Sequence, residues 1–156
     1  MNYRPRMSTV RDEVRLISQH KLAWQNRTGT PYQPDFAVDG VYTRVEDING
    51  HNPMSHSYIS TRNNVLIVDL GGLFKLHTVK VWSGISATYM TRLIGTFVYA
   101  DETLIGGIAE SIPLHNFRVT GTVFARRIIL RQTLAGYLDV NELQVFGSGP
   151  YGENEL

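Results

Sequence analysis

The sequence predicts an all-β chain that folds as one antiparallel β-sandwich. Two observations support this prediction: short segments of alternating apolar and polar residues recur along most of the chain, and no long helical pattern separates them. Glycine, proline or acidic turn residues end most of these segments, as in sandwiches whose strands are joined by tight loops. The 156 residues are enough for one ordinary domain.

The residues before the first expected strand, 1–21, leave two interpretations open. Val10, Val14 and Ile17 recur at near-helical spacing, which indicates a short helix over 9–20. Alternatively, the segment is an extended arm that leads into the sandwich. Either way we treat it as an N-terminal extension.

Alternation defines the expected strands. Val79 and Val81 share one face of a strand and Trp82 lies on the other, a pattern typical of a strand buried on one side. We expect Gly71-Gly72 to end the strand before it. The expected strands are the segment around Leu22 and Trp24 and residues 65–70, 77–83, 96–100, 111–117, 126–131 and 143–146.

These strands place the sandwich domain at residues 22–147, followed by a polar tail over 148–156. A long stretch with little periodicity, 26–64, interrupts the domain near its start. Loops of this length are usually functional or need a contact that orders them. The stretch begins with Asn26-Arg27-Thr28, which is a glycosylation sequon and favours an extracellular chain.

Composition argues against several classes of function. A formal net charge of +1 is too small for a dedicated nucleic-acid binder, and no apolar run approaches the ~20 residues of a membrane span. Cysteine is absent, which excludes a thiol nucleophile and fits a reducing compartment slightly better than a secreted one. Residues 1–20 show no signal-peptide pattern. No nucleophile elbow, phosphate loop or zinc-protease motif is present, so we expect the chain not to be an enzyme.

Four phrases in a fixed order carry a resemblance to a known family: AVDG at 37–40, LIVDLGG at 66–72, TRLIG at 91–95 and NELQVFG at 141–147. Over residues 22–147 the chain resembles the fucolectin-like (F-type lectin) branch of the discoidin, or coagulation factor 5/8 C-type, domains. The resemblance implies a jelly-roll, galactose-binding-domain-like sandwich that binds carbohydrate outside the cell. The tail GSGPYGENEL is similar to segments that open epidermal-growth-factor-like modules in extracellular proteins, but it lacks their cysteine.

The resemblance also implies a calcium site at Asp39 and Glu142. Calcium takes six to eight oxygen ligands, many of them backbone carbonyls, with carboxylates to balance its charge. The family often has an asparagine where this chain has Val41, so a carbonyl or a water would replace that ligand. The alternative is that Asp39 makes a turn with its own backbone and that Glu142 is a solvated carboxylate at a strand end.

For the sugar pocket, the resemblance matches His56 and Arg92 to residues that bind the sugar. Ser83 stands where the family has a further arginine, and Ser86-Ala87 replaces a vicinal cysteine pair. Losing a charged donor and an apolar platform each removes roughly 1–3 kcal/mol. Binding in the family's own mode is therefore expected to be weak.

Two aromatic residues flank the altered loop and could compensate. Trp82 and Tyr89 offer aromatic faces for the C–H side of a sugar ring. The alternative is that they cover the sandwich core or a sheet face, and Arg92 could likewise tie a loop carbonyl or pair with a carboxylate.

Two functions therefore stay open. The first is a calcium-stabilised module that binds a glycan, such as a fucose- or galactose-like sugar. The second is a non-catalytic module that docks on a protein partner, as a homo-oligomer or within a larger assembly.

Overall fold

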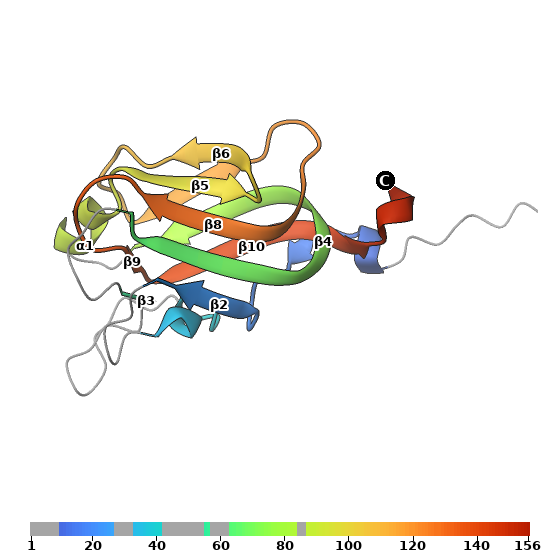
Figure 1. Cartoon of the computed structure of the whole chain (residues 1–156), viewed down its shortest axis with the longest axis horizontal. Coiled ribbons are helices and arrows are strands. Elements are labelled where there is room, and N and C mark those ends of the chain that lie inside the picture. Colours follow the sequence, from blue (N-terminus) through green and yellow to red (C-terminus); the bar gives the residue numbers. More distant parts are fainter. Residues whose placement is uncertain (1–9, 27–32, 42–54, 57–62, 84–86) are drawn as a thin grey trace, which may run out of the picture.

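The structure is a computed structural model that describes residues 10–26, 33–41, 55–56, 63–83 and 87–156. Antiparallel strands dominate it, and its helices are short (Figure 1). The strands are β1 (Arg15–Leu16), β2 (Leu22–Gln25), β3 (Ser55–His56), β4 (Val65–Trp82), β5 (Thr96–Ala100), β6 (Thr103–Gly107), β7 (Leu114–Arg118), β8 (Phe124–Gln132), β9 (Asp139–Val140) and β10 (Glu142–Tyr151). The helical elements are α1 (Ala87–Arg92) and the 3-10 turns η1 (Val10–Asp12), η2 (Pro34–Ala37) and η3 (Glu153–Glu155).

Strand β4 belongs to both layers of the sandwich. Its first part pairs with β2 and β8, and its second part pairs with β10 and β7. The β4–β8 register shifts between Asp69 and Phe74, where Gly71 has a φ of +78° that only glycine adopts easily. The expected break at Gly71-Gly72 is therefore wrong: the glycines bend the strand and do not end it.

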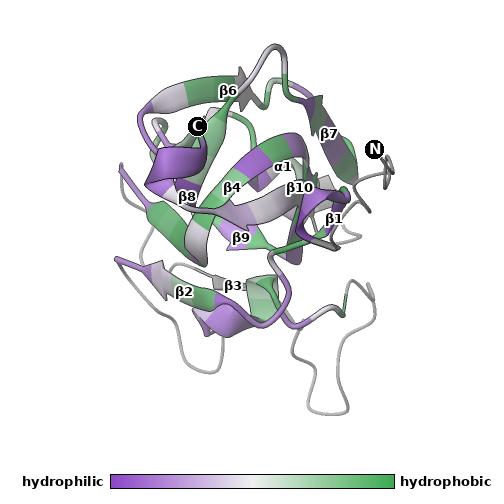
Figure 2. Cartoon of the chain, turned by 90° about the vertical axis from the view of Figure 1, so that its right-hand side faces the viewer, coloured by the Kyte–Doolittle hydropathy of each residue, from purple (hydrophilic) through white to green (hydrophobic). Residues whose placement is uncertain are grey.

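The two layers face each other across the apolar core. One layer has the order β2-β4-β8-β5-β6 and the other contains β1, β10, β4 and β7. In Figure 2, which looks along the sandwich, β8 and β2 lie on one side and β7 and β1 on the other. The core consists of the inward side chains of these strands, among them Leu66, Val68, Leu70, Val79, Val81, Val98, Ile128, Leu130, Leu143 and Val145, each at most 1% exposed.

The alternation seen in the sequence is confirmed by burial. Val79 and Val81 are fully buried, whereas Trp82 faces outward and is only partly covered. The strands expected at 96–100 and 126–131 are present, the latter as part of β8. The strand expected over 111–117 begins later, at Leu114, and β6 had no clear alternation to reveal it.

The N-terminal helix expected over 9–20 is wrong for the described residues. A single 3-10 turn, η1, is followed by β1, in which Arg15 and Leu16 pair with Gly147 and Phe146 of β10. The extended-arm alternative describes this segment. Strand pairing therefore extends beyond 22–147 at both ends, because β10 itself continues to Tyr151 and pairs there with Leu73 of β4.

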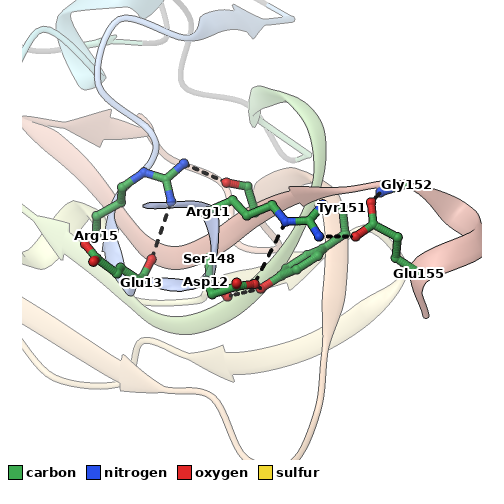
Figure 3. Close-up of polar contacts among 9 residues, drawn as sticks. Arg11, Asp12, Glu13, Arg15, Ser148, Tyr151, Gly152 and Glu155 are labelled. Carbon is green, nitrogen blue, oxygen red and sulfur yellow. Dashed lines mark hydrogen bonds and ion pairs between the residues drawn. The ribbon is translucent and has the colours of Figure 1, made fainter. Parts of the chain in front are cut away.

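The two ends of the described chain are fastened together. Arg11 forms an ion pair with Glu155, and its guanidinium carbon lies 5.4 Å from the centre of the Tyr151 ring (Figure 3). The Tyr151 hydroxyl lies 3.3 Å from the Asp12 carboxylate, to which it donates a hydrogen bond. These contacts are at the end of the sandwich opposite α1 and β9 (Figure 1).

Candidate functional site

An ion pair with a fully buried carboxylate fixes Arg92, the last residue of α1. Its Nη1 atom donates to Oδ2 of Asp139 at 2.7 Å. The Asp139 side chain is 0% exposed, whereas the Arg92 side chain remains 28% exposed. A buried carboxylate needs such a partner, since ionised groups are costly to remove from water. The pair therefore holds one edge of the guanidinium inside the protein and leaves part of the group at the surface.

Two tyrosine rings contact the same guanidinium. The Arg92 carbon Cζ lies 5.2 Å from the centre of the Tyr89 ring and 4.6 Å from that of Tyr137. Distances below about 6 Å place both rings in cation–π range. The sequence analysis selected Tyr89 but missed Tyr137, which lies in the loop between β8 and β9.

The buried side chain of Gln132, the last residue of β8, forms hydrogen bonds to the backbone of this cluster. Its Nε2 atom donates to the carbonyls of Arg92 (2.8 Å) and Tyr137 (2.9 Å). Its Oε1 atom accepts a 2.9 Å hydrogen bond from the Asn64 side chain, just before β4. One amide thus fixes the backbone at two residues of the cluster, Arg92 and Tyr137.

His56 is brought to this cluster by the short β3–β9 ladder. In that ladder His56 is directly opposite Asp139, the residue that holds Arg92. Chain segments distant in sequence therefore meet here, at the end of the sandwich where α1, β3 and β9 lie together (Figure 1). The backbone of His56 therefore lies next to the strand that holds Arg92, while the ligand-binding roles of His56, Arg92 and Tyr89 stay predictions.

Trp82 occupies a different position. It lies at the end of β4 on the outer face of the second layer, where its indole N–H donates to Oε1 of Gln144 at 2.9 Å. This is the sheet-face alternative from the sequence analysis. Ser83 is fully buried, and its backbone N–H donates to the carbonyl of Pro113. Residues 84–86 of the altered loop lie outside the described residues.

The proposed metal ligands Asp39 and Glu142 meet at a second point. The backbone N–H of Gly40 donates to Oε2 of Glu142 at 2.7 Å, which joins the loop after η2 to the start of β10. Gly40 has a φ of +82°, and a Cβ there would lie 2.5 Å from the Gln19 side-chain nitrogen. The positive φ favours glycine here, whereas the flexible Gln19 side chain could move away from a Cβ. Oδ1 of Asp39 accepts from the Val41 N–H, the turn contact considered as the alternative.

Without a cation, the ionisation of both carboxylates in this acidic pair is unfavourable. Burial, and then the neighbouring Asp39 carboxylate, raise the pKa of Glu142 from 4.5 to about 8, although the Gly40 N–H opposes the shift. Burial also raises the pKa of Asp39. Glu142 is 2% exposed, and its Oε1 atom is buried with no hydrogen-bond partner. The solvated-carboxylate alternative for Glu142 is therefore wrong.

These donors fit calcium better than zinc. The two carboxylates offer oxygen ligands, among them the buried Oε1 atom of Glu142, which has no hydrogen-bond partner. No group of three His, Cys, Asp or Glu side chains comes together within the part of the chain that the structure describes. Backbone carbonyls and waters would thus supply most ligands, which calcium accepts and structural zinc does not.

Comparison with solved structures identifies the fold. The chain is similar to a fucose-binding module of Streptococcus pneumoniae, with a TM-score of 0.71 and 21% identity over 86% of this chain and 96% of that one. It is similar to the lectin domain of Lectinolysin in complex with Lewis B antigen (TM-score 0.72, 21% identity, 85% and 96% coverage). The chain is also similar to a fucolectin from the serum of striped bass, Morone saxatilis (TM-score 0.70, 17% identity, over 88% of this chain and 48% of that one). The chain has the fucolectin-like, galactose-binding-like fold.

These structural neighbours of the fucolectin-like fold are carbohydrate-binding modules and not catalytic domains. A family 32 carbohydrate-binding module of Clostridium perfringens NanJ, in complex with galactose, is among them (TM-score 0.66, 18% identity, 86% and 99% coverage). No protein-family profile and no curated protein matches the sequence. None of the helices in the described residues is long and apolar enough to cross a bilayer.

Replacing Arg92 with alanine should destabilise the fold. The substitution leaves the buried Asp139 carboxylate without its cation, so we expect the free energy of unfolding to fall by about 2–4 kcal/mol in chemical denaturation. Arg118→Ala on the exposed face of β7 is the control and should change it by less than about 0.5 kcal/mol. Adding Asp139→Asn to Arg92→Ala should recover part of the loss; equal losses in all three variants would contradict a supporting ion pair.

In metal-free protein, stability should fall as pH rises. Between pH 4.5 and about 8, Glu142 ionises in the unfolded chain while it stays protonated in the folded one. The folded state therefore binds more protons across this range, and its free energy of unfolding decreases toward pH 8. Denaturation in chelator at several pH values measures the slope. Glu142→Gln should flatten it, and an unchanged slope in this variant would assign the pH dependence to other groups.

Proposed function

We propose that the chain is a non-catalytic glycan-binding module that calcium stabilises, with a pocket altered from that of fucose-binding relatives. A fucose- or galactose-like sugar would bind at the end of the sandwich where Arg92, Tyr89, Tyr137 and His56 gather. In support, the chain is similar in structure to a fucose-binding module and to modules in complex with Lewis B antigen or galactose.

The observation that carries this proposal is the state of the Arg92 guanidinium. A guanidinium has five N–H donors, and Arg92 places one hydrogen bond on Asp139. Its other N–H groups have no hydrogen-bond partner among the described residues. Because the side chain is partly exposed, a ligand can reach them. Sugar hydroxyls are suitable acceptors for such donors. The two tyrosines add aromatic surface for the C–H face of the same ring.

Asp139 acts through Arg92 in this proposal. Because it is buried and fixed in β9, it holds the guanidinium in one orientation before a ligand arrives. Preorganisation reduces the entropy lost on binding. This would offset part of the affinity lost with the arginine that Ser83 replaces.

Calcium would be held by Asp39, Glu142 and carbonyls of the loop at 37–40. When bound, it supplies positive charge next to the buried Glu142 carboxylate, so that this group can ionise at neutral pH. The Gly40–Glu142 hydrogen bond already joins the two segments. We place the module outside the cell, since millimolar calcium is available there and Asn26-Arg27-Thr28 is a sequon.

Calcium should raise the melting temperature of the chain. A ligand that binds only the folded state at a hundredfold excess over its Kd adds about 2.7 kcal/mol of stability. Differential scanning calorimetry with calcium, with magnesium and with chelator measures the effect, which should be largest for calcium. Glu142→Gln should remove most of the response. A melting temperature that calcium and chelator leave unchanged would contradict the proposed site.

A glycan array run with calcium and with chelator tests the ligand. We expect binding to fucosylated or galactose-terminated glycans, and Arg92→Lys should weaken it about tenfold or more because lysine keeps the charge but lacks the planar fork of donors. Arg118→Lys is the matched control and should bind as the parent does. Melting temperatures show that each variant is folded. A folded parent that binds no glycan, or an Arg92→Lys variant with unchanged affinity, would overturn the proposed function.

A further inference from the structure

The outer face of the first layer carries an apolar row that the sandwich core does not use. Register pairs align Trp24 of β2 with Ile67 of β4, Ile67 with Ile129 of β8, and Ile129 with Tyr99 of β5. None of the four is buried, and Trp24 is 55% exposed. A solvated sheet face normally carries polar residues at such positions. We call Trp24, Ile67, Ile129 and Tyr99 the apolar row.

A charged pair lies beside this row, two residues along the strands. Asp69 of β4 is directly opposite Arg127 of β8, yet the two side chains form no ion pair in the described structure. Oδ1 of Asp69 accepts a hydrogen bond from Gly71, which fixes the carboxylate. Arg127 is exposed, and its guanidinium contacts no carboxylate among the described residues. Both charges are therefore available to a partner.

We propose that a second copy of this chain packs on the outer face of the first layer through a two-fold axis parallel to the strands. When this axis runs between β4 and β8, β4 of each copy lies against β8 of the other copy. Because register partners lie side by side across the layer, Ile67 then faces Ile129 of the second copy, and Trp24 faces its Tyr99. The contact is isologous, so each pairing occurs twice.

Charge complementarity selects this axis. It sets Asp69 of each copy opposite Arg127 of the other, which gives two intermolecular ion pairs beside the apolar row. An axis perpendicular to the strands would instead bring Arg127 toward Arg131 of the second copy, because both project from the same face of β8. Like charges at that distance would oppose association.

The composition and shape of the face suit a protein surface. Trp, Tyr and Arg are enriched where protein interfaces concentrate binding energy, and two aliphatic side chains form the centre of the row. A shallow hollow beside Trp24 is lined by Leu22, Ile67, Asp69 and Arg127 and can receive a side chain of the second copy. A sugar fits this face less well, because the aliphatic side chains at its centre offer no hydrogen-bonding groups to the sugar hydroxyls. A formal net charge of +1 adds little repulsion between copies.

Sedimentation equilibrium of the full chain over a wide concentration range tests the proposal. We expect a reversible monomer–dimer equilibrium. Arg127→Asp, which places carboxylates opposite each other, should raise the dimer Kd about tenfold or more. Arg118→Asp makes the same charge change on the exposed face of β7 and should leave it unchanged. A chain that stays monomeric at every concentration, or equal effects of the two variants, overturns the proposal.

Fluorescence gives a second readout that does not depend on a charge change. The chain has two tryptophans, so Trp82→Phe leaves Trp24 as the only one. Its emission should shift to shorter wavelength as the dimer forms and the indole leaves water. Emission that stays the same across the concentration range overturns the proposal. So does a monomer whose Trp24 emission responds to array glycans, since that outcome assigns the face to a sugar.

Discussion

The constraint on which this fold depends is that both layers share strand β4. Its first part contributes Leu66 and Val68 to the core from one side, and its second part contributes Val79 and Val81 from the other. The bend at Gly71 lets a continuous backbone change layers, so hydrogen bonds connect the two sheets. Because every strand of the main sheet is linked to β4 directly or through one or two other strands, displacing it would disconnect the layers as well as expose the core.

The candidate site depends on this frame because its parts are short and lie between strands. Arg92 ends a helix of only six residues, and Tyr137 lies in a loop. Neither segment is long enough to hold a geometry alone. Buried polar groups anchored in the sheet fix them: Gln132 at the end of β8 and Asp139 in β9. The cost of burying these groups is offset in part because each one hydrogen-bonds to the segment that it positions.

Periodicity in the sequence was sufficient to predict which residues of β4, β5 and β8 face the core, since alternation depends only on local chain geometry. It misassigned Gly71-Gly72, because the same dipeptide ends a strand or bends it according to what packs beside it. The acidic pair Asp39 and Glu142 was found through motif order. Asp139 and Tyr137 were missed because pairing with Arg92 is decided by tertiary contacts, and a carboxylate next to apolar residues has no periodic signal. An exposed Arg near an aromatic-rich loop would have been the available clue.

The joined chain ends have a consequence for how the protein is displayed. Arg11 and Tyr151 meet at the pole of the sandwich opposite α1 and β9 (Figure 1). A tether attached after η3 would leave from that pole, away from α1 and β9. A molecule immobilised through that end would carry the proposed sugar-binding residues on its far side, facing the surrounding medium. In a two-fold assembly with its axis along the strands, both sets of these residues would point the same way, so one flexible stalk could present both sets to a single cell surface.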